Sequence, residues 1–137
     1  MSQRSRLPSH CSLLGIVLLL GPWLAADELV LTSRLHHLRN EKTREWASFS
    51  QQAEATSLDL SFRLPGKPTD STLRLRQQDV KQIWKVAING KMIDKLQQDE
   101  NDMVRYFAVP ANVLQPGNNQ LTISTSSKRG ADDIRVG

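Results

Sequence analysis

Carboxylates form the two clusters in this sequence that could hold a metal ion. The first contains Asp99, Glu100 and Asp102, and the second is the adjacent pair Asp132 and Asp133. Calcium prefers oxygen ligands, which makes Asp99 and Asp102 the candidate metal ligands of the first cluster. Neither cluster has the D-x-[DN]-x-[DN]-G spacing of an EF-hand loop. We therefore predict no resident cofactor, with calcium left open at these carboxylates.

Histidine, serine and cysteine do not form a pattern typical of an enzyme. His36 and His37 are adjacent, and neighbours in a strand point to opposite faces, so the two cannot easily share one metal ion. No histidine follows them, no G-x-S-x-G motif is present, and the one cysteine is Cys11. We expect the histidine pair to lie on the surface and the protein to be a non-enzyme.

Two aromatic residues are candidates for binding a ligand. Trp46 stands beside charged residues, and an exposed indole ring is a surface on which a carbohydrate can stack. Tyr106 alternates out of phase with Phe107, so it should point outward if Phe107 points inward. Trp84, by contrast, is in phase with Val86 and is expected in the core. Trp46 and Tyr106 are thus the predicted ligand-binding residues.

The first 26 residues have the order of a secretory signal peptide. Two arginines precede an apolar run from Leu13 to Leu20, and the small pair Ala25-Ala26 follows. Leu24 is larger than the residue preferred at its place before the cut, which leaves an uncleaved membrane anchor as an alternative. We predict a signal peptide over 1–26, one module over 27–137, and a secreted or periplasmic location.

The charge of the chain does not indicate a nucleic-acid partner. The net charge of the whole sequence is +4, but residues 1–26 hold two arginines and no acidic residue. Sixteen basic and fourteen acidic residues remain, and they are interspersed. Because phosphate binding requires basic residues gathered on one face, we expect no nucleic acid as partner, and a membrane only if the anchor is uncleaved.

From residue 57 onward, apolar and polar residues alternate with the period of a half-buried strand. Asn89-Gly90 predicts a type I′ turn, because both residues tolerate positive φ, and Pro116-Gly117 predicts a second chain reversal. Short strands bounded by such turns indicate an all-β sandwich. The alternating segments are 58–64, 72–76, 84–88, 105–109 and 120–124, with a further strand beginning near Ile134.

The segment from 27 to 55 has a mixed pattern. Leu29 and Leu31 suit a first strand, whereas Leu31, Leu35 and Leu38 have the i, i+4, i+7 spacing of a helix. We predict a strand, then a charged surface segment with a short helix near 34–47 as an option. Trp46 and the nearby Phe49 would then enter the core.

Two phrases of the sequence resemble those of galactose-binding-like jelly rolls, which include the sugar-binding domains at the front of many glycoside hydrolases. Residues 84–91 match the pattern W-x-V-x-hydrophobic-N-G-K, and residues 114–123 match L-x-P-G-x-N-x-L-x-hydrophobic. The likeness covers roughly residues 58–124 and implies a jelly-roll β-sandwich. The positions expected to be structural are Trp84, Asn89, Gly90, Pro116 and Gly117.

A fainter resemblance is to an N-terminal module found ahead of secreted bacterial metallohydrolase domains. It is carried by Arg44-Glu45-Trp46, by residues 76–81 and by the closing phrase 132–137. We therefore expect a non-catalytic accessory or binding module of an exported protein, with carbohydrate as the ligand. The alternatives are a structural module that packs against a downstream hydrolase domain and a truncated fragment of a larger secreted hydrolase.

Overall fold

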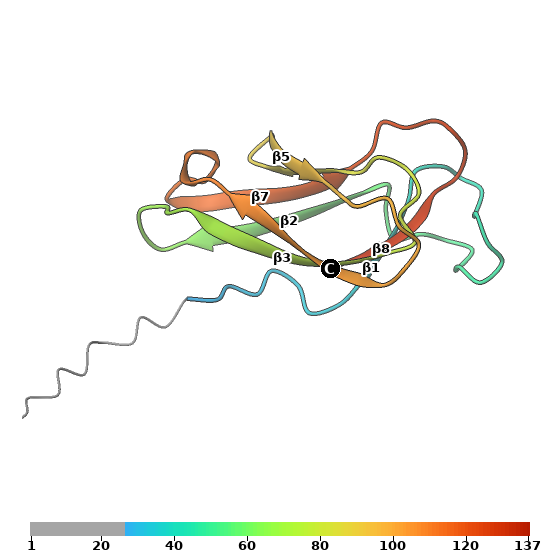
Figure 1. Ribbon diagram of the computed structural model, residues 1–137, viewed down its shortest axis with the longest axis horizontal. Helices are drawn as coiled ribbons and strands as arrows, with labels where there is room; N and C mark the ends of the chain where they lie inside the picture. Colours follow the sequence, from blue (N-terminus) through green and yellow to red (C-terminus); the bar gives the residue numbers. More distant parts are fainter. Residues whose placement is uncertain (1–26) are drawn as a thin grey trace, which may run out of the picture.

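Short strands make up most of the regular structure in residues 27–137, the part of the chain that the computed structural model describes (Figure 1). The expected signal peptide, with Cys11 and Trp23, lies outside the described residues. The strands are β1 (His36–Arg39), β2 (Ser57–Leu64), β3 (Ser71–Gln78), β4 (Lys85–Ile88), β5 (Lys91–Lys95), β6 (Met103–Val109), β7 (Gly117–Ser124) and β8 (Asp133–Val136). A 3-10 turn, η1 (Ala111–Val113), stands between β6 and β7.

The strands form two four-stranded antiparallel sheets. The first sheet has the order β1-β8-β3-β6, and the second has the order β2-β7-β4-β5. In both sheets, strands that are distant in sequence pair with each other. In the β1–β8 pair, for example, His36 lies opposite Val136. The all-β, two-sheet class predicted from the alternating pattern is confirmed.

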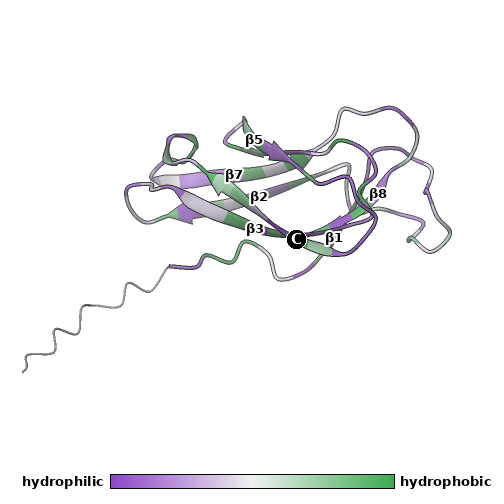
Figure 2. Ribbon diagram, viewed as in Figure 1, coloured by the Kyte–Doolittle hydropathy of each residue, from purple (hydrophilic) through white to green (hydrophobic). Residues whose placement is uncertain are grey.

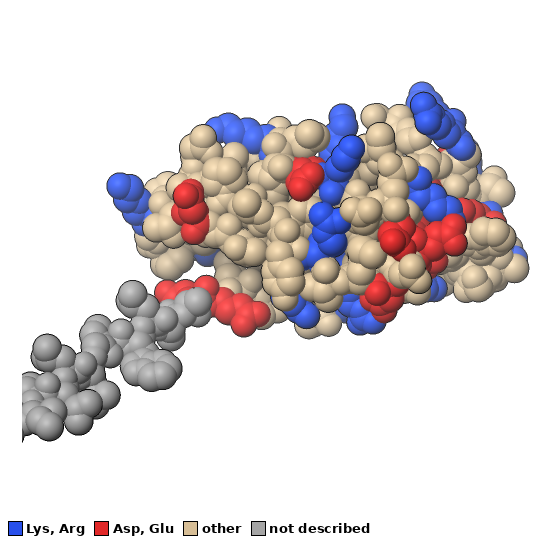
Figure 3. All heavy atoms as spheres, in the orientation of Figure 1, with Lys and Arg blue, Asp and Glu red and all other residues tan. Residues whose placement is uncertain are grey.

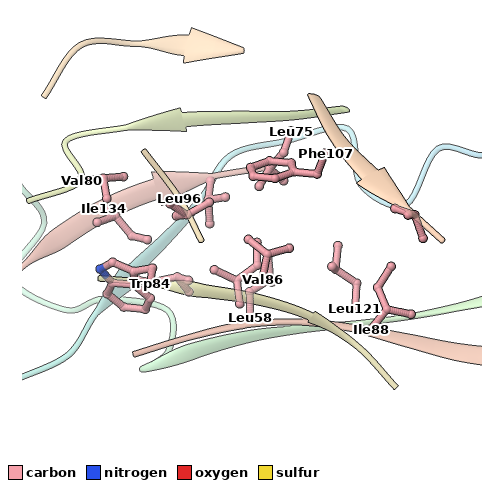
Figure 4. Close-up of a cluster of buried hydrophobic side chains, with 14 residues drawn as sticks. Leu58, Leu75, Val80, Trp84, Val86, Ile88, Leu96, Phe107, Leu121 and Ile134 are labelled. Carbon is pink, nitrogen blue, oxygen red and sulfur yellow. The ribbon is translucent and has the colours of Figure 1, made fainter. Parts of the chain in front are cut away.

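The core lies between the inner faces of the two sheets, where apolar side chains from both meet (Figure 4). In Figure 2, hydrophobic and hydrophilic residues succeed one another along the strands. Alternation places every second residue inward, so that on β6 Phe107 is buried and Tyr106 is 65% exposed. Burying one large apolar side chain contributes roughly 1.5–3 kcal/mol. The buried cluster comprises Leu38, Leu58, Leu75, Val80, Trp84, Val86, Ile88, Leu96, Phe107, Val109, Leu121, Ile123, Ile134 and Val136.

The β4–β5 hairpin turns at Asn89 and Gly90, whose φ angles are +50° and +77°. Both values are positive, as a type I′ turn requires. Asn89 also fixes the neighbouring strand, because its Nδ2 donates to Asn119 Oδ1 at 2.8 Å and its Oδ1 accepts from the backbone N–H of Gln120 at 3.0 Å. Gly117, after Pro116, begins β7 with a φ of +85°. The two phrases quoted for the jelly-roll resemblance therefore contact each other.

The prediction for residues 27–55 was wrong in two respects, and the helix considered as an option near 34–47 does not form. The chain there is extended as β1 and then irregular. Leu29 lies outside any strand and is 52% exposed. Of the two aromatics expected in the core, Phe49 is buried, but Trp46 is 54% exposed. The physical reason for the missing helix is that β1 gains a full partner in β8, which supplies hydrogen bonds and a buried face.

Four loops gather at one end of the sandwich, on the right in Figure 1. Because the strands alternate in direction, the connections β1–β2, β3–β4, β5–β6 and β7–β8 all emerge there. We call this the loop end, and it consists of residues 40–56, 79–84, 96–102 and 125–132. Among residues 27–137, no helix is long and apolar enough to cross a membrane.

Candidate ligand-binding site at the loop end

Asp133 anchors the β1–β2 loop from inside the protein. Its side chain is fully buried at the first position of β8. Oδ1 lies 2.5 Å from Arg39 Nε and 2.6 Å from His37 Nε2, and Oδ2 accepts the backbone N–H of Glu45 at 2.6 Å. Arg39 continues outward, since Nη2 donates to the carbonyl of Ser50 at 2.7 Å. The loop is therefore tied to one buried ion pair at two points, Glu45 and Ser50.

Asp132 anchors the β3–β4 loop in the same way. It is fully buried, and its carboxylate accepts three N–H groups. Oδ1 accepts from the backbone of Lys81 at 3.2 Å, while Oδ2 accepts from the backbone of Gln82 at 2.9 Å and from Trp84 Nε1 at 2.8 Å. The calcium interpretation does not describe this pair of aspartates, because their oxygens are used by protein donors. They hold loops in place.

The histidine pair is part of this network and was wrongly expected on the surface. Both side chains are only 12% exposed. His36 Nδ1 lies 3.2 Å from Glu54 Oε2, and the ring of His37 stacks on Phe49 with 5.2 Å between centroids. Arg34 adds two hydrogen bonds to Glu54, at 2.7 and 2.8 Å. Arg34 and Arg39 therefore form ion pairs with Glu54 and Asp133, which come later in the sequence.

These contacts shift the pKa values of two carboxyl groups downward. Burial by itself raises the pKa of Asp133, but the hydrogen bonds from the Glu45 backbone, His37 and Arg39 together outweigh it, so the pKa lies below its usual value. The hydrogen bonds from Arg34 lower the pKa of Glu54 to about 2. Both groups are therefore charged in the folded protein at neutral pH.

The protein is expected to lose stability in acid. Carboxyl groups whose pKa values are lower in the folded state than in the unfolded state, where they are about 4, stabilise the fold above that pH. This contribution disappears as the pH falls through the folded values, so the free energy of unfolding should decline from about pH 5 to about pH 2. Urea unfolding followed across this range measures it, and Asp133→Asn should flatten the profile. A stability that rises on acidification would contradict the network.

Trp46 is an exposed residue of the β1–β2 loop that Asp133 anchors. Its neighbour Glu45 is fixed through the backbone to Asp133, and its own carbonyl accepts the N–H of the buried Phe49 at 3.1 Å. Lys81 Nζ lies 5.9 Å from the centre of the Trp46 ring and 3.2 Å from the Glu45 carboxylate. The backbone that carries the indole is therefore anchored, while more than half of the surface of Trp46 is open to solvent.

A groove of about 410 Å³ begins at Lys81. It is formed by the β3–β4, β5–β6 and β7–β8 connections together with the start of β4, and the ionisable side chains that line it are all basic. Figure 3 shows basic side chains over the loop that follows β7. Lys81 contributes both to the groove and to the face of Trp46, which joins the two features into one surface. The lining residues are Lys81, Gln82, Ile83, Lys85, Gln98, Ser126, Ser127 and Arg129.

A second, more open hollow of about 600 Å³ lies at the opposite end, around the start of β7. Its walls carry amides, among them Asn89, Gln115 and Asn119. These amides bind one another: Asn119 Oδ1 accepts from Asn89 Nδ2 at 2.8 Å and from the backbone N–H of Gln115 at 2.9 Å. Their hydrogen-bonding capacity is used in the turn, whereas the groove at the loop end is lined by Lys85 and Arg129, which belong to no ion pair within residues 27–137. The groove is therefore the better candidate for a site.

The other residues predicted from sequence lie apart from this surface or have protein partners. Tyr106 is in the middle of β6, opposite Arg74, and so outside the loop end. Asp102 accepts two hydrogen bonds from Arg76, one of them from Nε at 2.7 Å, and Asp99 accepts the backbone N–H of Asn101 at 2.8 Å. Residues 27–137 contain no group of three or more histidine, cysteine or acidic side chains placed to hold a metal ion.

The three phrases of the fainter resemblance meet at the loop end. Glu45 of the first phrase binds Asp133 of the third, and Lys81 of the second binds Asp132. Reasoning from the sequence missed the groove and the anchoring role of the two aspartates, and the only signal for them was that these phrases stood out together. No protein-family model matches the chain, and no curated protein matches it.

Proposed function

We propose that this protein is a non-catalytic carbohydrate-binding module and that the loop end is its binding site. The observation that carries the proposal is an exposed Trp46 in a loop whose backbone is anchored to a buried ion pair on either side of it, at Glu45 and at Ser50. Exposing an indole forgoes the stabilisation that its burial would bring, and ordering its loop costs conformational entropy. A binding platform explains both costs, because a rigid aromatic face loses little freedom when a ligand stacks on it. The groove beside it supplies hydroxyl and ammonium groups for the sugar hydroxyls.

We infer further that the sandwich is of the jelly-roll type. The strand orders β1-β8-β3-β6 and β2-β7-β4-β5 support this, because consecutive strands mostly alternate between the sheets. A jelly roll has eight strands in two such sheets. The contact between Asn89 and Asn119 gives the galactose-binding-like phrases a physical reason to occur together. An extracellular or periplasmic location is consistent with a polysaccharide ligand.

Trp46→Ala is expected to weaken carbohydrate binding at least tenfold. A central aromatic anchor is worth about 1.4 kcal/mol or more, which corresponds to that factor. The fold should remain, with a change in the free energy of unfolding below about 1 kcal/mol, since the side chain is largely exposed. The measurement is retardation in affinity electrophoresis against a panel of soluble polysaccharides, after a glycan array has selected the ligand.

Tyr106→Ala provides the matched control, because Tyr106 is also exposed but lies on β6. It should bind as the unmodified protein does. Equal loss of binding in both variants, or full binding by Trp46→Ala, would place the site elsewhere. If the unmodified protein bound no glycan, the proposed function would be overturned.

A second candidate function is a structural module that packs against a hydrolase domain. It is favoured by the outer face of the first sheet, where Val104 and Tyr106 expose apolar surface side by side along β6. For this candidate, Tyr106→Ala should weaken association with the partner domain while Trp46→Ala leaves it unchanged. The two variants therefore separate the two functions.

A further inference from the structure

The ionisable side chains that line the groove are all basic. Lys85 and Arg129 line it, and Lys81 stands where the groove meets Trp46. Glu45 offsets the charge of Lys81 at 3.2 Å. Within residues 27–137, no ion pair includes Lys85 or Arg129, so their charges are available to a ligand.

A second observation is the position of Lys85 in the sheet. Lys85 on β4 lies directly opposite Lys95 on β5 in the register of the hairpin, and both are exposed. Like charges directly opposite each other on neighbouring strands are destabilising. An anionic group bound between or beside the two ammonium groups would relieve this repulsion.

We infer that the carbohydrate bound at the loop end is an acidic polysaccharide, whose carboxylate or sulfate groups are recognised by Lys85 and Arg129 while a sugar ring stacks on Trp46. This inference rests on the proposed function and adds the chemical class of the ligand. The Gln82 and Gln98 amides donate to the backbone carbonyls of Gly130 and Lys81, each at 2.7 Å. The hydroxyls of Ser126 and Ser127 make no hydrogen bond within residues 27–137, and they provide partners for ring hydroxyls. A neutral glycan would leave two basic side chains of the groove unpaired.

Affinity electrophoresis with charge-matched polysaccharides tests the inference. Polygalacturonate is compared with its fully methyl-esterified form, and sulfated carrageenan is compared with neutral agarose. Polyglutamate serves as a polyanion without sugar rings. We expect stronger retardation by one anionic polysaccharide than by its neutral counterpart, weak retardation by polyglutamate, and weakening of the anionic interaction by added salt. The carboxylate and sulfate arms tell which acidic group is recognised.

The variant Lys85→Gln/Arg129→Gln should lower the affinity for that polysaccharide about three- to tenfold, the loss expected from two exposed ion pairs. Its control, Lys67→Gln/Arg74→Gln, removes the same charge from the β2–β3 turn and the outer face of the first sheet. The control should bind within about twofold of the unmodified protein. An equal loss in both double variants would show attraction by net charge alone and overturn the assignment of Lys85 and Arg129.

The outcomes separate the inference from the function beneath it. Equal binding of the acidic and neutral forms would overturn the inference and leave a carbohydrate-binding module in place. Retardation by polyglutamate as strong as by polygalacturonate would overturn the carbohydrate function while leaving an anion-binding surface. Binding of none of these polymers or of any arrayed glycan would overturn both.

Discussion

Asp133→Ala is expected to lower the free energy of unfolding by about 3–5 kcal/mol, the cost of removing one partner from a buried ion pair. The substitution leaves Arg39, which is 3% exposed, without its carboxylate at 2.5 Å. It also removes the acceptor of the Glu45 backbone N–H. Because whole domains are stable by only about 5–15 kcal/mol, a large part of the variant should be unfolded at moderate urea concentrations. Urea titration followed by circular dichroism measures the change.

Two further variants help to interpret the loss of stability in Asp133→Ala. Asp133→Asn keeps the size of the side chain but removes the charge facing Arg39, so it should also be strongly destabilised. Asp94→Ala removes an exposed aspartate whose side chain, within residues 27–137, accepts only the N–H of the adjacent Lys95, and it should change the free energy of unfolding by less than about 0.5 kcal/mol. A loss below about 1 kcal/mol in Asp133→Ala would mean that the loop end does not depend on this anchor.

Trp84→Ala is expected to lower the free energy of unfolding by a similar amount, about 3–5 kcal/mol, because a large buried side chain would leave a cavity. Trp84 has no exposed surface, and its indole nitrogen faces the edge of the core in Figure 4, where it donates to Asp132. Trp84→Phe separates the two contributions. It keeps most of the volume and deletes the donor, which should cost about 1–3 kcal/mol.

The natural control for Trp84→Ala is the same substitution at Trp46, which has the opposite environment. Thermal unfolding of the two alanine variants under identical conditions compares them directly. Trp84→Ala should unfold at a much lower temperature, whereas Trp46→Ala should unfold close to the unmodified protein. Similar unfolding temperatures for the two variants would contradict the distinction between a core tryptophan and a surface tryptophan.

The second half of the chain could be predicted well from local patterns. Alternation located β2, β3, β6 and β7 because each has one face on the core and one face in solvent. Asn89-Gly90 located the hairpin turn because few other residue pairs adopt positive φ at both positions. These signals are local, and their physical causes act within a few residues.

The first part of the chain could not be predicted in this way. In β1, charged Arg39 is buried next to apolar Leu38, so the strand does not alternate. Arg39 is buried because Asp133, 94 residues away in sequence, pairs with it. A dense run of charges near residue 40 is typical of a solvated surface unless such a partner exists. A single sequence does not reveal the partner.

The candidate site was only half predictable for the same reason. Trp46 was selected because it stands among charged residues, yet the same segment was expected to carry it into the core. Lys81 and Arg129 are separated by 48 positions, and only the packing of the loops brings both to the groove. Asp132 and Asp133 were considered as oxygen ligands because their residue type fits calcium. In the structure both are buried and accept N–H groups of the protein, so that they anchor loops.

The most direct test of the binding site is the indole N–H signal of Trp46 in a ¹⁵N-edited nuclear magnetic resonance spectrum, assigned by its absence in Trp46→Phe. The unmodified protein is titrated with oligogalacturonate, or with an oligosaccharide of whichever glycan the array selects. We predict that the Trp46 signal shifts progressively and saturably, while that of the buried Trp84 stays in place. Saturable binding that leaves the Trp46 signal unmoved would contradict the account.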